Sequence, residues 1–238
     1  MTPHLTRRLL AEFLGTALLV TVVVGSGIAA EQLSPGDVGI QLFENSTATV
    51  FGLAALILLF GPVSGAHFNP VVSLADWFLG RRAGRGLTLS HVAAYAVAQL
   101  AGGVCGALLA NEMFDIDAGL STKDRVSEGH LVAEIVATAV LIALIFALAR
   151  TGRGAIAAPA VGAYIGAAYW FTSSTSFANP AVTVGRMFSD TFAGIAPASV
   201  PPFIAMQLVG LMVGVVVTSV LYPDAGEHAD DVVLPHSN

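Results

Sequence analysis

The sequence predicts an all-α membrane protein with six transmembrane helices and two re-entrant half-helices, arranged as an inverted repeat. Of its 238 residues, 55% are hydrophobic and only 11% are charged, whereas soluble domains carry about 25% charged residues. Two Asn-Pro steps, Asn69-Pro70 and Asn179-Pro180, each follow a run of small or polar residues and precede a short apolar segment. The motifs of the first half also recur in the second half in the same order.

Six apolar stretches are candidates to cross the hydrocarbon core of a bilayer, which is about 30 Å thick. They are apolar on nearly all sides, as helices surrounded by lipid are. The second and fifth stretches are short, and each runs directly into one of the Asn-Pro steps. The stretches are Leu9–Ala29, Ser46–Phe60, Leu89–Met113, Leu131–Ala149, Ala155–Phe171 and Pro201–Tyr222. We expect one membrane domain over 1–238, with a polar, disordered tail at 223–238.

Each Asn-Pro step predicts the start of a short helix. Proline is favourable in the first helical turn because its missing N–H would have no partner there, and asparagine is a good N-cap. The apolar segments that follow predict helices of about ten residues, or roughly 15 Å. Such a helix crosses only half of the hydrocarbon core, so each one is expected to enter and leave the membrane on the same side.

The chain repeats itself, with approximate copies at 9–113 and 131–222. Each copy opens with an Ala-Glu-x-x-small-Thr-Ala motif, contains one Asn-Pro step and carries a Gln-Leu pair in its last span. Because each copy holds three spans, the second enters the membrane from the opposite face, and the two half-helices are expected to meet near the midplane. The matching residues are Glu12 and Glu134, Asn69 and Asn179, and Gln99 and Gln207.

Basic residues predict the orientation of the chain in an inner (plasma) membrane. With six spans, both termini lie on the same side. Seven basic residues then share that side, and three lie opposite. Because Lys and Arg concentrate in cytoplasmic loops, we expect both termini in the cytoplasm. The seven are Arg7, Arg8, Arg81, Arg82, Arg85, Arg150 and Arg153, and the three are Lys123, Arg125 and Arg186.

The two re-entrant loops predict a pore, because non-helical backbone inside a bilayer is tolerated only where protein or a water-filled cavity surrounds it. Helix N-termini carry about half a positive charge each, so a cation at the centre would be repelled from both sides. The side chains of Asn69 and Asn179 offer N–H donors to a passing oxygen atom. A ladder of backbone carbonyls at Gly65, Ala66, His67, Ser176 and Phe177 offers acceptors. This arrangement suits small neutral hydroxylated solutes.

At these residues the chain resembles the aquaporins and glycerol facilitators, the major intrinsic proteins. The resemblance covers most of the sequence from Leu9 to Tyr222 and implies a passive channel that works as a homotetramer in a lipid bilayer, with one pore in each protomer. The motifs that carry it are Ser64-Gly65-Ala66-His67-Phe68-Asn69-Pro70-Val71, Asn179-Pro180-Ala181 and the two Ala-Glu-x-x-x-Thr motifs. The pore's Asn-Pro-Ala region then comprises Asn69, Pro70, Val71, Asn179, Pro180 and Ala181.

The chain departs from the family pattern at two positions. Val71 stands where the family usually has alanine, and we expect a mild effect because Val71 would pack behind the pore. Val182 stands where the family's selectivity filter usually has arginine. Arg186 lies one helical turn further on, on a similar face. It could partly replace the lost charge near the mouth, but we expect an exposed residue on the rim.

Counting along the family's spacing gives the remaining filter positions. The filter becomes Thr49 (or Phe51), Ala167 (or Gly166), Ser176 and Val182, which predicts a small, uncharged and wide constriction. The chain thereby resembles bacterial members without the filter arginine that are associated with arsenic handling. That resemblance suggests arsenous acid or methylated arsenicals as permeants, beside water and glycerol.

The resemblance also implies structural roles for the buried polar residues. The carboxylates of Glu12 and Glu134 would hold backbone N–H groups of the re-entrant loops, and Gln99 and Gln207 would assist them. We expect His67 to be a fixed residue that shapes the cytoplasmic mouth. No cofactor, metal site, nucleic-acid patch or catalytic arrangement is predicted, so the protein is not expected to be an enzyme. The alternative function is an ion-coupled secondary transporter, because inverted repeats with broken helices build those too.

Overall fold

The computed structural model describes residues 4–225 and 227. Across these residues the chain forms eight α-helices, and six helical segments are long and apolar enough to cross a membrane. The fold class predicted from the sequence is confirmed. The helices are α1 (Leu5–Leu33), α2 (Val38–Ser64), α3 (Pro70–Gly80), α4 (Leu89–Met113), α5 (Glu128–Arg150), α6 (Ala157–Phe171), α7 (Pro180–Arg186) and α8 (Val200–Leu221), with single 3₁₀ turns at Gly154–Ile156 and Pro197–Ser199.

Several helices differ in length from the predicted spans. Helix α2 has 27 residues, because its polar first turns remain helical and pair with neighbours. There Asn45 Nδ2 donates to the carbonyl oxygen of Val23 at 2.8 Å, and Ser34 Oγ donates to Glu44 at 3.0 Å. Helix α7 has seven residues instead of about ten. The prediction of a disordered tail falls mostly outside the described residues.

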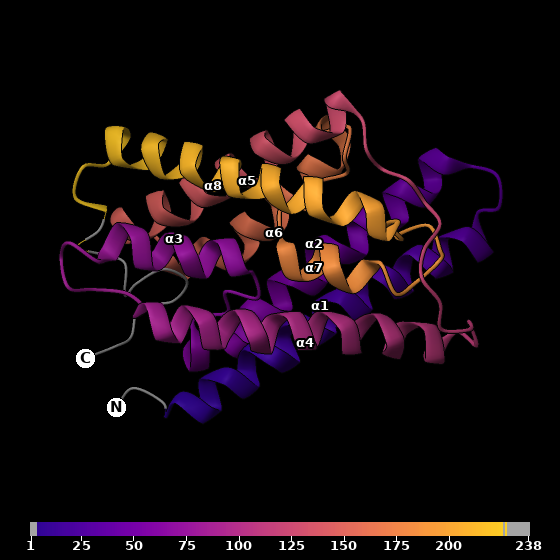
Figure 1. Cartoon of the computed structure of the whole chain (residues 1–238), viewed down its shortest axis with the longest axis horizontal. Helices are drawn as coiled ribbons and strands as arrows, with labels where there is room; N and C mark the ends of the chain where they lie inside the picture. The colour runs from indigo at the N-terminus through magenta and orange to yellow at the C-terminus, as the bar shows by residue number, and fades with distance from the viewer. Residues whose placement is uncertain (1–3, 226, 228–238) are drawn as a thin grey trace.

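Helices α3 and α7 are the two half-helices, and the six long helices surround them. Figure 1 shows α3 in the left half of the bundle and α7 to the right of its centre. Helix α1 begins and α8 ends at the left, on the same side of the molecule. This arrangement is the one that six crossings and two half-crossings require.

The two halves use the same close helix pairs, α1 with α4 and α5 with α8. A Cβ added at Gly106 of α4 would lie 2.1 Å from the carbonyl oxygen of Ala17, and one at Gly214 of α8 would lie 2.7 Å from that of Ala139. No larger residue fits at such an approach between helix backbones. Glycine therefore sets the spacing at the equivalent crossing in each half.

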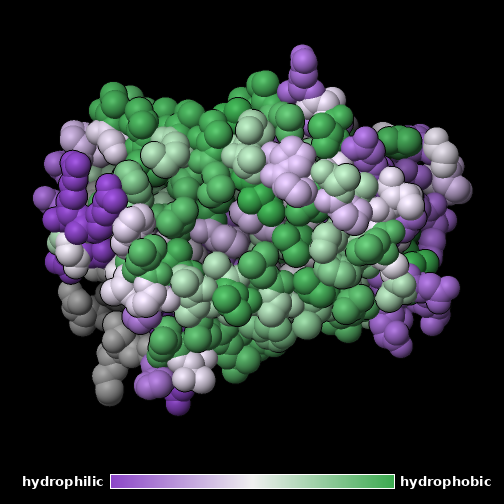
Figure 2. Space-filling model, viewed as in Figure 1, coloured by the Kyte–Doolittle hydropathy of each residue, from purple (hydrophilic) through white to green (hydrophobic). Residues whose placement is uncertain are grey.

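The outer surface carries a broad apolar band. Figure 2 shows hydrophobic residues across the middle of the molecule and hydrophilic residues gathered at its two ends. Large apolar side chains of the long helices, such as Phe43, Leu59, Val97 and Val220, are exposed on the outer surface. A band of this kind matches the hydrocarbon core of a bilayer, and the polar residues that function requires lie inside the bundle.

Candidate functional site

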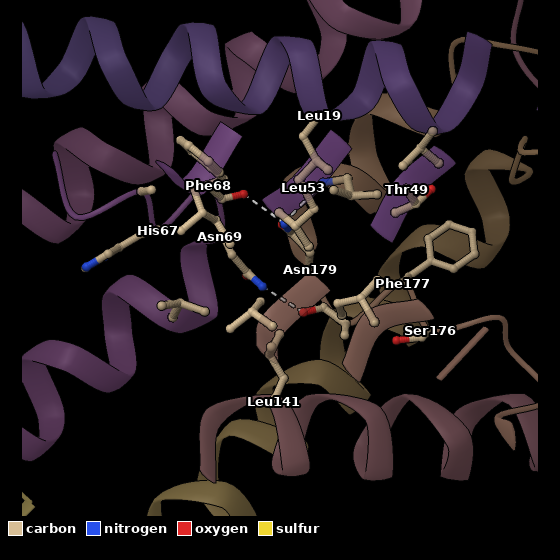
Figure 3. A pocket seen from close by; sticks show the side chains of 18 of the residues that line it. Leu19, Thr49, Leu53, His67, Phe68, Asn69, Leu141, Ser176, Phe177 and Asn179 are labelled. Carbon is tan, nitrogen blue, oxygen red and sulfur yellow. Dashed lines mark hydrogen bonds between the residues drawn. The ribbon is translucent and has the colours of Figure 1, made fainter. Parts of the chain in front are cut away.

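The two Asn-Pro steps meet at the centre of the bundle and are joined to each other. Asn69 Nδ2 donates to the carbonyl oxygen of Ala178 at 2.8 Å, and Asn179 Nδ2 donates to the carbonyl oxygen of Phe68 at 2.8 Å (Figure 3). In the part of the chain that the structure describes, these are the bonds that the two amide nitrogens make. One N–H of each amide therefore remains for a partner other than the protein.

Each asparagine also caps its own half-helix. Asn69 Oδ1 accepts the N–H of Val71 at 3.1 Å, and Asn179 Oδ1 accepts the N–H of Ala181 at 2.9 Å. Both asparagines have extended backbone, and a proline follows each at the first helical position. The positive ends of α3 and α7 thus converge on the same point.

The loops that lead into the half-helices contain left-handed residues other than glycine. Ala66 and Phe68 have φ of 48° in the first loop, and Ser176 and Ala178 have φ of 52° and 48° in the second. Such backbone is strained and persists only where its surroundings hold it in place. It also leaves peptide N–H groups without a helical partner, and these groups turn to two buried carboxylates.

The first loop is held by Glu12 of α1. Its carboxylate accepts the peptide N–H of His67 at 3.0 Å and that of Phe68 at 2.7 Å. It also accepts the hydroxyl of Ser64 at 2.6 Å and Nε2 of Gln99 at 2.7 Å. Four donors therefore converge on one carboxylate that is fully buried.

The second loop is held in the same way by Glu134 of α5. Its carboxylate accepts the peptide N–H of Phe177 at 3.0 Å, that of Ala178 at 2.9 Å and Nε2 of Gln207 at 2.7 Å. Gln207 donates further to the hydroxyl of Thr183 at 2.9 Å. Both carboxylates are fully occupied in holding the loops, and neither is among the residues that line the cavity described next.

A cavity of about 70 Å³ passes beside the two asparagines. At about 10–15 Å³ for each water, this volume holds on the order of five molecules. In Figure 3, His67 lies toward one end, and Thr49, Ser176 and Phe177 lie toward the other. The walls between are largely hydrocarbon, contributed by residues such as Leu19, Leu53, Val72, Leu141, Ile145 and Val161.

Three predicted filter residues, Thr49, Ser176 and Val182, line this cavity. The alternative Phe51 does not, because its side chain is 71% exposed on the outer face of α2. Val71 is buried but is not among the lining residues, whereas its neighbour Val72 is.

The two residues predicted from α6, Ala167 and its alternative Gly166, do not line the cavity. Ala167 is exposed on the outer face, and a Cβ at the alternative Gly166 would meet Val50 of α2 at 2.1 Å. The cavity is lined instead by Ile165 and Tyr169, which share one helix face at a spacing of four residues. The count along the family's spacing therefore placed the α6 filter position on a face that does not line the cavity. Tyr169 was therefore missed, and its hydroxyl lies 3.2 Å from that of Thr49.

Most residues of the predicted carbonyl ladder line the cavity, namely Ala66, His67, Ser176 and Phe177. Gly65 does not belong to that set. It is the left-handed C-cap of α2, with φ of 87°, and its N–H donates to the carbonyl oxygen of Gly61 at 2.9 Å. A residue occupied in ending a helix is thus set back from the cavity wall.

Arg186 is not the exposed rim residue that the sequence suggested. Its side chain is 2% exposed and lines the cavity, because the segment after α7 folds back over it. Its Nε donates to the carbonyl oxygen of Ala193, and its guanidinium carbon lies 3.6 Å from the ring centroid of Phe177. The cavity therefore carries a cation, whereas the sequence predicted an uncharged constriction.

The segments that surround the Arg186 end of the cavity are fixed by their own polar contacts. Asp190 Oδ1 accepts the N–H of Thr122 at 2.8 Å, and this bond holds the pKa of the Asp190 carboxyl below its usual value. Arg125 Nε donates to the carbonyl oxygen of Gly194 at 2.6 Å. Burial lowers the pKa of Arg125 to about 10, so this side chain remains charged at neutral pH.

Comparisons with known proteins all match the same family of membrane proteins. Residues 1–178 match the family model of the major intrinsic protein. The chain is 48% identical over 207 residues to the aquaglyceroporin AqpS of Rhizobium meliloti, covering 87% of this chain and 86% of that one. It is 33% identical over 227 residues to a glycerol uptake facilitator protein of Pseudomonas aeruginosa, covering 82% and 78%.

A solved structure shares the fold. The aquaglyceroporin from Plasmodium falciparum superimposes with a TM-score of 0.62 and covers 93% of this chain and 99% of its own. The two sequences are 18% identical, so the match speaks for the fold alone.

Proposed function

This chain belongs to the major intrinsic protein family of multi-pass membrane channels, and from that premise we propose that it conducts water and glycerol passively. One observation carries the proposal: the paired amides of Asn69 and Asn179 lie beside a small cavity of about 70 Å³ whose walls are largely apolar. Two relatives have names that refer to glycerol transport. Members of this family are channels and not enzymes.

The geometry favours neutral hydroxylated solutes for a physical reason. A glycerol molecule can accept the spare N–H of each asparagine through its oxygens and lay its carbon backbone against the hydrocarbon wall. A small cation meets two helix N-termini there and has no carboxylate to compensate for its lost water. Hence a solute that accepts hydrogen bonds is stabilised at the centre, and a positively charged solute is destabilised there.

We assign the roles at the centre as follows. Asn69 and Asn179 contact the permeant, while Pro70, Val71, Pro180 and Ala181 start the half-helices that aim them. The loops between are supported by the four buried side chains of Glu12, Glu134, Gln99 and Gln207. Their contacts with the loops and with each other support this assignment.

We further propose arsenous acid and methylated arsenicals as permeants, with Thr49, Ser176 and Val182 at the outer filter. Arsenous acid is a small neutral polyhydroxy molecule, as glycerol is, and it would use the same donors and acceptors. The short side chain of Val182, where the family usually has arginine, supports this finer proposal. Proteoliposomes that show no arsenite or methylarsenical flux above empty vesicles would refute it.

The organisation of the protein in the cell follows from the same premise. We propose one membrane domain over 1–238 with inverted repeats at 9–113 and 131–222. The distribution of basic residues supports cytoplasmic termini in an inner membrane. We also propose a homotetramer in which each protomer keeps its own pore.

Stopped-flow light scattering on proteoliposomes tests the function. Vesicles with the protein should shrink faster than empty vesicles under an impermeant osmolyte, which reports water flow. They should then re-swell when glycerol or arsenite is the osmolyte. Equal rates for glycerol in loaded and empty vesicles would contradict the proposed glycerol channel.

A further inference from the structure

Arg186 is a buried cation without a carboxylate partner among the described residues. Its side chain is 2% exposed, and no ion pair joins it to an acidic group there. Its guanidinium carbon lies 3.6 Å from the ring centroid of Phe177, and Arg125 lies 5.2 Å from the same ring. A lone buried charge is costly, so this placement requires a compensating benefit.

The terminal nitrogens of Arg186 have no hydrogen-bond partner in the described chain. Only Nε is bonded, to the carbonyl oxygen of Ala193. The side chain lines the cavity, so its remaining N–H groups are open to whatever the cavity contains. Ser176, on the same cavity, has a buried hydroxyl that also lacks a protein partner. A strong donor group and a hydroxyl are thus both left for a molecule inside the pore.

The position of Arg186 follows from the sequence of α7. Val182 and Arg186 are four residues apart and therefore lie on the same helix face. Since Val182 is short, the cavity beside it is not filled from that turn, and the longer side chain from the next turn reaches the wall. The face of Phe177 and the carbonyl of Ala193 hold the guanidinium there.

We propose that Arg186 is the charge-selecting residue at the outer end of the pore. It repels cationic solutes and donates to the oxygen of neutral ones, while Ser176 provides the second contact. The inference deepens the channel function proposed above and rests on it. It goes beyond that function by naming a barrier to cations separate from the two half-helix N-termini at the centre.

Urea and guanidinium test the proposal because they are planar molecules of nearly the same shape that differ in charge. Proteoliposomes would be assayed for influx of each, with the wild-type glycerol flux measured first. Wild-type protein should pass urea and exclude guanidinium. Arg186→Met removes the charge but keeps the length, and it should raise the guanidinium-to-urea flux ratio about 10-fold.

Matched variants separate charge from packing. Arg186→Lys keeps the charge and should leave the ratio near the wild-type value. Arg81→Met is the control, because its guanidinium also stacks on an aromatic ring, 4.0 Å from the Phe78 centroid, but lies outside the cavity. Adding Val182→Arg to Arg186→Met returns an arginine to the cavity and should restore exclusion.

Two results would overturn the proposal. One is wild-type protein that passes guanidinium as readily as urea, a result that does not depend on any variant folding. The other is Arg186→Met protein, eluting as wild type in detergent, whose flux ratio is unchanged. Failure of the channel function is distinguished from both, because it would appear as absent glycerol flux in the wild-type vesicles.

Discussion

The two re-entrant segments share one framework, position by position. In each, a buried glutamate accepts two loop N–H groups, and the asparagine amide donates to the opposite loop. In each, a hydroxyl four residues after the asparagine accepts a hydrogen bond from the side-chain amide of a glutamine on a long helix. Ser73 accepts from Gln99, and Thr183 accepts from Gln207. The repeat thus supplies the centre of the pore twice, once from each side.

The segments differ where they approach the two mouths. Two residues before the asparagine stands His67 in the first segment and Phe177 in the second. Seven residues after it stands Asp76 in the first, which accepts the N–H of Leu87 at 2.6 Å, and Arg186 in the second. The framework positions are therefore alike in the two segments, and the positions near the two ends of the cavity differ.

The largest expected effect is the loss of a shared framework residue. Glu12→Ala leaves the N–H groups of His67 and Phe68 buried without partners, at about 1–3 kcal/mol each. Glu134→Ala likewise leaves the N–H groups of Phe177 and Ala178 without partners. Glu134 accepts no hydroxyl equivalent to that of Ser64, so its loss should lower the free energy of unfolding by less. Thermal unfolding in detergent measures both variants. A smaller decrease in thermal stability for Glu12→Ala than for Glu134→Ala would contradict this ranking.

The next largest effect on stability is expected from Asn69 and Asn179, whose side-chain amides each donate to the opposite loop. Asn69→Ala and Asn179→Ala each remove a helix cap and a bond between the loops, for about 1–2 kcal/mol apiece. Because the two residues contact adjacent parts of the same junction, the double variant should deviate from additivity by at least about 0.5 kcal/mol. Strict additivity in the same unfolding assay would mean that the loops are held independently.

Val182→Arg sharpens the contrast between the two mouths. A second long side chain in the outer cavity should reduce glycerol flux several-fold while sparing water, which needs less room. Val182→Thr, nearly the same size, serves as the control and should leave both fluxes unchanged. If glycerol flux were equal before and after Val182→Arg, position 182 would not be part of the constriction.

The smallest effect concerns the outer segment. The N–H of Thr122 lowers the pKa of Asp190, so this carboxylate stabilises the fold above its unfolded pKa of about 3.9. That contribution is lost as pH falls through the lower folded value. Asp190→Asn should therefore lose less thermal stability than wild type between pH 7 and pH 3, by about 1–2 °C. Identical losses would show that this carboxylate contributes nothing.

Composition and motif order were sufficient to predict the six spans, the two half-helices and their capping asparagines. Hydropathy could not predict the first turns of α2, because polar residues such as Glu44 and Asn45 are typical of loops. They are helical here, where their side chains bond to Ser34 and to the carbonyl oxygen of Val23. Nor did counting along the family's spacing show which face of α6 turns toward the cavity. Tyr169 was missed for that reason.

Arg186 shows a different limit of sequence reasoning. Its helical face was read correctly, one turn beyond Val182. Its burial, however, depends on a segment that folds back after α7 and offers the carbonyl of Ala193. Such long-range cover leaves no periodic signal, so a charged residue near a helix end was taken for an exposed one.

The central claim is that two half-helices meet to form a passive route for uncharged molecules, and glycerol flux under imposed ion gradients tests it most directly. Proteoliposomes would be loaded with glycerol at a series of concentrations, with and without proton or sodium gradients. We expect the flux to rise in proportion to the glycerol gradient and to be the same with and without a proton or sodium gradient. Saturation at low glycerol concentration together with uphill accumulation driven by either ion would contradict the channel and favour a coupled transporter.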